Sequence, residues 1–182
     1  MTLDEKLIDL LRHRSVRTGT FTLASGKTSD FYVDARQTTL HAEGAHVIAQ
    51  LILKRLHPSV SAIGGPVTGA DPITGAVVAL SHSTDRPIHG FMVRKEAKGY
   101  GTQNWLEGRA NLEAGCSVCV IEDTVTTGGS LLRAIERVEA AGYKVVQCIA
   151  VVDREEGARE IIEQSGYPFE ALCTRTALIG NS

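Results

Sequence analysis

The chain has 182 residues, of which 43% are hydrophobic and 22% charged. This is the length of one domain and ordinary globular usage, which excludes a disordered or low-complexity chain. With 19 basic and 21 acidic residues the formal net charge is −2, so no global basic excess indicates nucleic acid or a membrane surface as partner. No basic N-terminal start precedes an apolar run, and the most apolar stretch, 75–80, is far shorter than a membrane helix. A cytoplasmic location is therefore expected.

Hydrophobic periodicity predicts the elements in chain order. Residues 3–13 are expected to form an amphipathic helix, and the β-like runs 21–23 and 31–33 flank a turn-forming stretch, which predicts a hairpin. Beyond the hairpin, helices are predicted at about 41–57, 71–82, 129–141 and 155–164, and strands at 60–63, 88–93, 117–121, 145–152 and 169–172. Residues 95–109 show no apolar period and contain three glycines, so a long loop is expected there.

Strands that alternate with helices predict an α/β fold, with a mostly parallel sheet covered by helices on both faces. The chain is expected to be a single domain, in which residues 1–36 form a small hood over the site and residues 37–182 form the α/β core. Ligands of such sheets bind beyond the carboxyl ends of the strands. That rule directs attention to residues 64–66, 94–95, 122–123 and 153–154.

The chain has four cysteines, Cys116, Cys119, Cys148 and Cys173. Cys116 and Cys119 form a C-x-x-C pattern, but they lie in a predicted strand, where residues three apart point to opposite faces. No second C-x-x-C exists to complete a zinc site. The cysteines are expected to be small buried hydrophobes.

The most informative stretch is 118–130, where an apolar strand leads into Glu122, Asp123 and the turn sequence T-T-G-G-S, followed by an amphipathic helix. The glycines allow successive N–H groups to converge on one point, the helix N-terminus lies there, and hydroxyls add donors. Two carboxylates would repel a bare phosphate beside them. They are compatible with such a site if they accept hydrogen bonds from sugar hydroxyls, or face a Mg²⁺ ion that neutralises the phosphates. The ligand is expected to carry a phosphate, a vicinal diol and a metal ion. Helix capping by Thr and Ser would explain one hydroxyl but not the acid pair.

The string from Val120 to Ser130 resembles the phosphoribosyl diphosphate signature of type I phosphoribosyltransferases. The segments 21–34, 94–108 and 153–157 resemble, in that order, the N-terminal hairpin, the mobile catalytic loop and the orotate-binding turn of the orotate phosphoribosyltransferase family. The resemblance implies a transferase of pyrimidine biosynthesis, in which orotate displaces diphosphate from 5-phosphoribosyl 1-diphosphate with Mg²⁺ as cofactor. It also implies a homodimer whose loop 95–109 reaches the neighbouring subunit's site, with Lys95 acting there.

The same resemblance implies roles for individual residues. The catalytic residues are expected to be Lys95, Lys98 and Asp123. Phosphoribosyl diphosphate is expected to contact Arg94, Lys95, Lys98, Tyr100, Glu122, Asp123, Thr124, Val125, Thr126, Thr127, Gly128, Gly129 and Ser130. Orotate is expected to contact Thr126, Tyr32 and Arg154, with the guanidinium of Arg154 on its carboxylate. No metal ligand from the protein is expected, because Mg²⁺ would be held mainly by substrate oxygens and water.

Several alternatives stay open at this stage. Arg154 could instead form a surface ion pair with Glu155 or Glu156, and residues 94–98 could be a solvated charged helix turn. The enzyme could use another base, such as a purine or uracil, which would need no clamp for a carboxylate. A non-catalytic, nucleotide-sensing RNA-binding regulator on the same fold would show a basic face with interleaved aromatic residues, which a net charge of −2 and 5% aromatic content do not favour.

Overall fold

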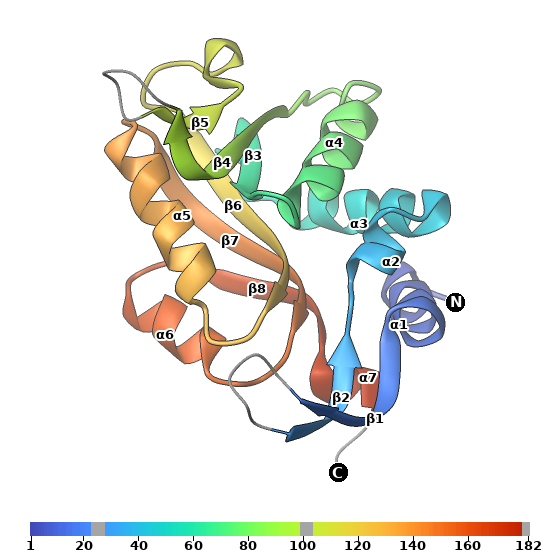
Figure 1. Cartoon of the computed structure of the whole chain (residues 1–182). Helices are drawn as coiled ribbons and strands as arrows, with labels where there is room; N and C mark the ends of the chain where they lie inside the picture. The colour runs from blue at the N-terminus through green and yellow to red at the C-terminus, as the bar shows by residue number, and fades with distance from the viewer. Residues whose placement is uncertain (23–27, 99–103, 180–182) are drawn as a thin grey trace.

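The computed structural model describes residues 1–22, 28–98 and 104–179, with the backbone alone at 18, 20, 22, 28–30, 97, 98 and 104 (Figure 1). Its elements are α1 (Leu3–Arg14), β1 (Val16–Thr22), β2 (Thr28–Val33), α2 (Arg36–Thr39), α3 (Ala42–Arg55), β3 (Ala62–Pro66), α4 (Ala70–Ser81), β4 (His89–Lys98), β5 (Asn104–Glu107), a 3₁₀ turn (Arg109–Asn111), β6 (Ser117–Val125), α5 (Gly129–Ala140), β7 (Lys144–Asp153), α6 (Ala158–Gln164), β8 (Phe169–Thr174) and α7 (Arg175–Ile179). No helix in these ranges is long and apolar enough to cross a membrane.

The main sheet has six strands in the order β5-β4-β3-β6-β7-β8, and its neighbours are parallel except for β4 and β5. Helices α5 and α6 cover one face, and α3 and α4 lie on the other (Figure 1). The predicted α/β fold with a mostly parallel sheet is therefore confirmed. The short helices α2 and α7 were not predicted, because four or five residues are too few to show a helical period.

An apolar cluster packs on each face of the sheet. In β6, Val118 and Val120 join Leu131 and Ile135 of α5 in one cluster. Cys119 and Ile121 join the other cluster, together with residues of α1, α3 and α4. Cys116 is packed against the first cluster and Cys119 lies in the second. The prediction that these two cysteines face opposite sides is confirmed, and all four cysteines are free thiols.

The ends of two central strands differ from the prediction. The strand predicted at 60–63 is observed as β3, Ala62–Pro66, and it includes Gly64 and Gly65. These glycines allow close strand packing, because a Cβ on Gly65 would lie 1.8 Å from the carbonyl oxygen of Ile121. The strand predicted at 117–121 continues to Val125 as β6. The acid pair therefore lies within the last part of this strand and not after it.

The expectation of a long loop at 95–109 is wrong for much of that segment. Residues 95–98 belong to β4, and Asn104–Glu107 form the antiparallel edge strand β5. Among the side chains of β5 that the structure describes, Leu106 is fully buried and Trp105 is half-buried. An edge strand held mainly by backbone pairing needs no alternating apolar pattern, so the sequence carried no strand signal.

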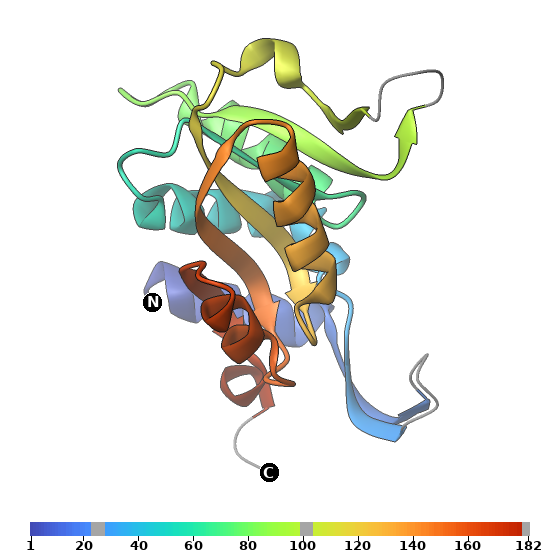
Figure 2. The same ribbon diagram turned by 90° about the vertical axis from the view of Figure 1, so that its left-hand side faces the viewer.

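The N-terminal hairpin is confirmed, and β1 and β2 form a separate antiparallel sheet that extends away from the body of the molecule (Figure 2). Helix α1 does not extend with it. Its Leu7 and Leu11 are completely buried in the cluster that contains Ile48 and Ile52 of α3. Within the described part of this region, the end of β2 and the residues that follow it line the cavity described below.

Candidate active site

A cavity of about 520 Å³ opens at the carboxyl ends of β3, β4 and β6, where parallel sheets bind ligands. Its walls are the end of β2 with the start of α2, the turn after β3, the end of β4, the acid pair of β6 and one face of α5. The lining residues are Tyr32, Val33, Asp34, Ala35, Arg36, Pro66, Val67, Thr68, Gly69, Val93, Lys95, Glu122, Asp123, Thr124, Ser130, Arg133, Ala134 and Arg137.

Glu122 and Asp123 place two carboxylates in this cavity. Burial raises the pKa of Glu122 to about 7, although a hydrogen bond with the Ser130 hydroxyl lowers it. Burial likewise raises the pKa of Asp123, whose Oδ1 accepts a hydrogen bond of 2.8 Å from the backbone N–H of Thr124. Desolvation penalises the charged forms. The pair is therefore suited to ligands that replace the lost water, such as hydroxyl groups or a hydrated cation.

The turn after β3 fits closely around Asp123. A Cβ on Gly69 would lie 2.5 Å from Oδ1 of Asp123 and 2.7 Å from its Cγ. Gly69 has helical backbone angles, φ −65° and ψ −39°, so space and not conformation requires a glycine here. The preceding Val67–Thr68 peptide bond is cis. None of the predicted site residues lies in this turn, because its contact with β6 is a contact between distant parts of the chain.

A second cavity of about 270 Å³ lies at the N-terminus of α5 and is enclosed by the loop 124–130 together with Glu122 and Arg133. Gly128 has φ +80°, a conformation that favours glycine. The first N–H groups of a helix have no partner within it, and such a terminus attracts anions. The predicted residues Thr124 to Ser130 thus form one cradle. It shares Glu122, Thr124, Ser130 and Arg133 with the larger cavity.

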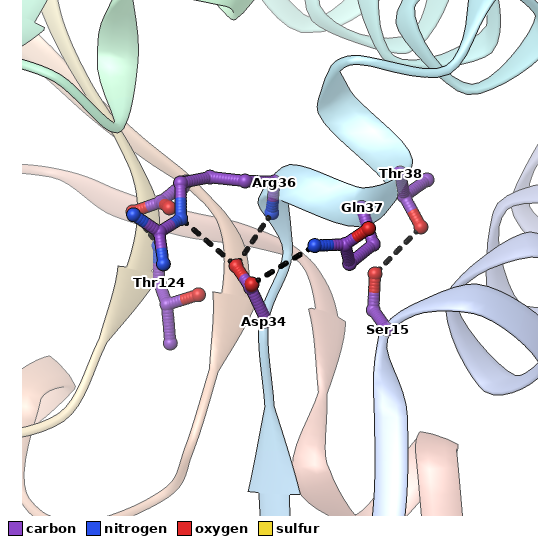
Figure 3. A network of polar contacts seen from close by, with 7 residues as sticks. Ser15, Asp34, Arg36, Gln37, Thr38 and Thr124 are labelled. Carbon is purple, nitrogen blue, oxygen red and sulfur yellow. Dashed lines mark hydrogen bonds and ion pairs between the residues drawn. The ribbon is translucent and has the colours of Figure 1, made fainter.

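Arg36 was not among the predicted site residues. Its Nε donates a 2.9 Å hydrogen bond to Oδ1 of Asp34, and Gln37 donates to the other carboxylate oxygen at 3.2 Å (Figure 3). Burial raises the pKa of Asp34, but these hydrogen bonds outweigh burial and the net pKa is lowered. Figure 3 shows that the Arg36 side chain extends from α2 toward Thr124 of β6. Ala35 has helical backbone angles and Arg36 begins α2, so no strand alternation with Tyr32 and Asp34 could have indicated this residue.

Two predicted cations of β4 lie on different sides of the strand. Lys95 lines the cavity of its own chain, and its action in the neighbouring subunit's site stays a prediction. Arg94 does not line the cavity, because alternate residues of a strand point to opposite faces. Its Nη1 lies 2.6 Å from Oε1 of Glu107 on β5. The side chain of Lys98 and the whole of Tyr100 fall outside the described residues.

Arg154 does not line the cavity in this structure. It is buried, with Nη2 2.8 Å from Oε1 of Glu156, so the alternative of an ion pair with Glu156 is the one observed. The guanidinium lies 5.9 Å from the ring of Phe31. Its Nε is buried without a hydrogen-bond partner among the described residues, which leaves a donor that a ligand can use. Tyr32 does line the cavity, with 39% of the residue exposed.

This fold, with a phosphate cradle beside two carboxylates, defines a phosphoribosyl-transfer class of protein, and residues 36–165 match the phosphoribosyl transferase domain family. An orotate phosphoribosyltransferase of Nostoc sp. is 44% identical over 173 residues, 95% of this chain and 84% of that protein. The solved structure of Mycobacterium tuberculosis orotate phosphoribosyltransferase with Fe(III) dicitrate has a TM-score of 0.83 at 38% identity and covers 98% of this chain and 99% of that one. A structure of the same enzyme with 5-phospho-α-D-ribosyl 1-diphosphate has a TM-score of 0.79 at 35% identity, over 97% and 99% of the two chains. The chain belongs to the orotate phosphoribosyltransferase family.

Proposed function

We propose that this chain transfers the 5-phosphoribosyl group from 5-phosphoribosyl 1-diphosphate to orotate, giving orotidine 5′-phosphate and diphosphate for pyrimidine biosynthesis. The C1′–O bond to diphosphate breaks with its electron pair on the leaving oxygen, a bond from the orotate ring nitrogen to C1′ forms, and the proton of that nitrogen passes to the departing diphosphate or to water. The observation that carries the proposal is a cradle for one phosphate that opens directly into a larger cavity beside paired carboxylates. The comparison with the Nostoc relative supports orotate as the base.

The 5′-phosphate of the donor fits the cradle at the N-terminus of α5. The backbone N–H groups and the hydroxyls of Thr126, Thr127 and Ser130 would donate to its oxygens. Val125, Gly128 and Gly129 contribute backbone to the same cradle. Glu122 and Asp123 would accept hydrogen bonds from the ribose hydroxyls, which compensates for the desolvation of their carboxylates.

The diphosphate would lie toward the cations of the larger cavity. Lys95 lines it from β4, Arg36 lines it from α2, and Arg133 and Arg137 line it from α5. Negative charge on the diphosphate grows as the C1′–O bond breaks, so fixed cations there stabilise the transition state more than the ground state. Lys98 and Tyr100 stay predictions for the same group.

The acid pair also suits Mg²⁺ that arrives with the donor. Mg²⁺ keeps several waters and binds through one or two carboxylates plus substrate phosphates, and the described residues contain no group of three or more His, Cys, Asp or Glu arranged to hold a metal. Glu122 and Asp123 would therefore face the ion through water or the ribose hydroxyls. When bound, the ion neutralises charge on the diphosphate.

Arg154 would bind the carboxylate of orotate, as a planar guanidinium can with two parallel hydrogen bonds. Its unpartnered Nε supports this role, because the edge formed by Nε and Nη2 can take a second carboxylate oxygen once the Glu156 carboxylate moves away. Thr126 and Tyr32 are proposed to contact the base from the cradle and from the end of β2.

We also propose a homodimer in which the segment 95–109 takes part in the neighbouring site. The orientation of Arg94 supports it, because this cation points away from the cavity of its own chain. Mixing two impaired variants, Arg94→Ala and Glu122→Gln, tests the arrangement. If Arg94 acts across the dimer, each mixed dimer contains one intact site, and activity returns to about a quarter of the unmodified level after subunit exchange. Absence of recovery would mean that Arg94 serves its own chain.

The activity is tested by offering orotate, uracil and adenine in turn with the donor and Mg²⁺, and measuring diphosphate release. We expect turnover with orotate. Turnover of uracil or adenine without turnover of orotate would contradict the proposal. The Arg154→Ala variant should raise KM for orotate much more than KM for the donor. Arg159→Ala, which removes a half-buried arginine paired with Glu163 outside the cavity, is the matched control and should leave both KM values within twofold.

A further inference from the structure

Arg137 lies on the face of α5 that lines the cavity. Ser130, Arg133, Ala134 and Arg137 all line it, at the spacing of three and four residues that places side chains on one helix face. The opposite face, which includes Ile135, is buried in the core. The helix that begins at the phosphate cradle therefore also presents Arg137 to the end of β4.

The guanidinium of Arg137 donates to two backbone carbonyls of β4. Nη1 lies 2.7 Å from the carbonyl oxygen of Arg94, and Nη2 lies 3.4 Å from that of Lys95. Regular pairing is interrupted at this point, because the register of β4 with β3 ends at Val93 and its register with β5 shifts between Val93 and Lys98. Backbone carbonyls that lose a partner on folding cost free energy. The Arg137 side chain takes the place of a neighbouring strand here.

The same guanidinium also stacks on the neighbouring strand. Its Cζ lies 4.0 Å from the centroid of the Trp105 ring on β5, within the range of a cation–π contact. A planar guanidinium can donate in its plane and stack through its face, whereas an ammonium group cannot do both. One side chain thus joins α5 to both strands of the ribbon formed by β4 and β5.

We propose that Arg137 is a positioning residue for the phosphoribosyl diphosphate site. By holding the base of the ribbon against α5, it fixes the backbone from which Lys95 reaches the cavity. The two ends of the donor would then be bound by elements that Arg137 joins: the 5′-phosphate by the start of α5, and the diphosphate by Lys95. This inference rests on the proposed function, and its test includes measurements that need no turnover.

The test compares Arg137→Gln and Arg137→Lys with the unmodified full-length protein. Both variants should raise KM for the donor at least tenfold, about 1.4 kcal/mol, with kcat and KM for orotate changed by less than threefold. Trp105 is the only tryptophan of the chain, so its fluorescence reports the ribbon directly. In both variants its emission should shift to longer wavelength as the stacked guanidinium is lost.

Arg109→Gln is the matched control. Arg109 also donates to a backbone carbonyl, that of Ala141 at 3.2 Å, and lies 5.8 Å from the ring of Tyr143, but it does not line the cavity. This variant should keep the donor KM and the Trp105 emission of the unmodified protein.

Thermal melting shows whether each variant is folded. If Arg137→Gln does not fold, the donor KM and Trp105 emission of Arg137→Lys test the positioning role. A folded variant with unchanged donor KM and unchanged emission would overturn the proposal. Arg137→Lys with the donor KM and the Trp105 emission of the unmodified protein would also overturn it. So would a fall in kcat with an unchanged donor KM in either variant, because that would indicate direct participation of Arg137 in the reaction. If the unmodified protein does not turn over orotate, calorimetric binding of the donor and the Trp105 emission still test this role, so the two failures are distinguishable.

Discussion

Replacing Glu122 by Gln should make the ligand-free protein more stable, by an amount that grows as pH rises from about 4.5 to about 7. Burial raises the pKa of Glu122 from 4.5 to about 7. Between these values the folded protein binds more protons than the unfolded chain, so the free energy of unfolding falls as pH rises through this window. At 1.36 kcal/mol per pH unit the whole interval corresponds to about 3 kcal/mol. Gln is neutral at every pH and keeps an oxygen that can accept from Ser130.

We therefore expect Glu122→Gln to raise the free energy of unfolding by about 2–3 kcal/mol at pH 8 and by less than about 0.5 kcal/mol at pH 4.5. Urea titrations of both proteins at pH 4.5, 6, 7 and 8, without ligand, measure the difference. Glu136→Gln removes an exposed glutamate of α5 outside the cavity, and its effect should not change with pH. An equal effect of Glu122→Gln at pH 4.5 and pH 8, or a loss of stability at pH 8, would refute the reasoning.

The same titration should appear in catalysis. A protonated Glu122 is a poorer acceptor for ribose hydroxyls, so KM for the donor should rise as pH falls through about 7, the pKa of this carboxyl group. In Glu122→Gln the donor KM should be higher at every pH and should lose this pH dependence. Initial rates at saturating orotate over pH 5.5–8.5 measure it. A dependence that persists in the variant would assign the titration to another group.

Two further substitutions test contacts of the site. Gly69→Ala should raise the donor KM at least tenfold, because the new Cβ would lie 2.5 Å from the Asp123 carboxylate and displace it. The control is Gly75→Ala, in a helix where a Cβ would meet no atom within 4 Å; it should leave the donor KM unchanged and stabilise the protein by about 0.5–1 kcal/mol. Equal donor KM values in both variants would contradict the contact between Gly69 and Asp123. Glu156→Gln should lower KM for orotate about threefold to tenfold, because it removes the carboxylate that pairs with Arg154 in the absence of substrate, and a raised KM in the same steady-state assay would mean that Glu156 holds Arg154 in its binding position.

The parts of the structure that sequence could predict are those in which the signal is local. The phosphate cradle is one continuous segment, so its glycines, hydroxyls and helix start can be recognised together in the sequence without knowledge of the rest of the fold. The helices with a buried face, such as α3 and α5, show a period that survives whatever they pack against. The strand β6 was predicted from a local signal too, its run of apolar residues, although its end at Val125 depends on its pairing with β7.

The parts that sequence could not predict depend on contacts between distant segments. Arg36 reaches the site only because the chain after β2 lies beside the end of β6 (Figure 3). Gly69 matters only because Asp123 lies against it. The strand β5 has a single fully buried side chain and is held by its neighbour, so no window of sequence around it indicates a strand.

Arg94 and Lys95 show why a residue-by-residue resemblance can identify a group of residues without placing each member. The motif 94–98 indicates a set of cations that face a phosphorylated ligand, but the side on which each lies follows from the parity of the strand. That parity depends on the register irregularity between Val93 and Lys98, where backbone pairing is interrupted. Arg137, far along the chain, supplies the hydrogen bonds that hold the backbone there. Strand alternation divides Arg94 and Lys95 between the two sides of β4, but which of them faces the cavity is a tertiary property. It connects the assembly of the site with the helix that begins at the phosphate cradle.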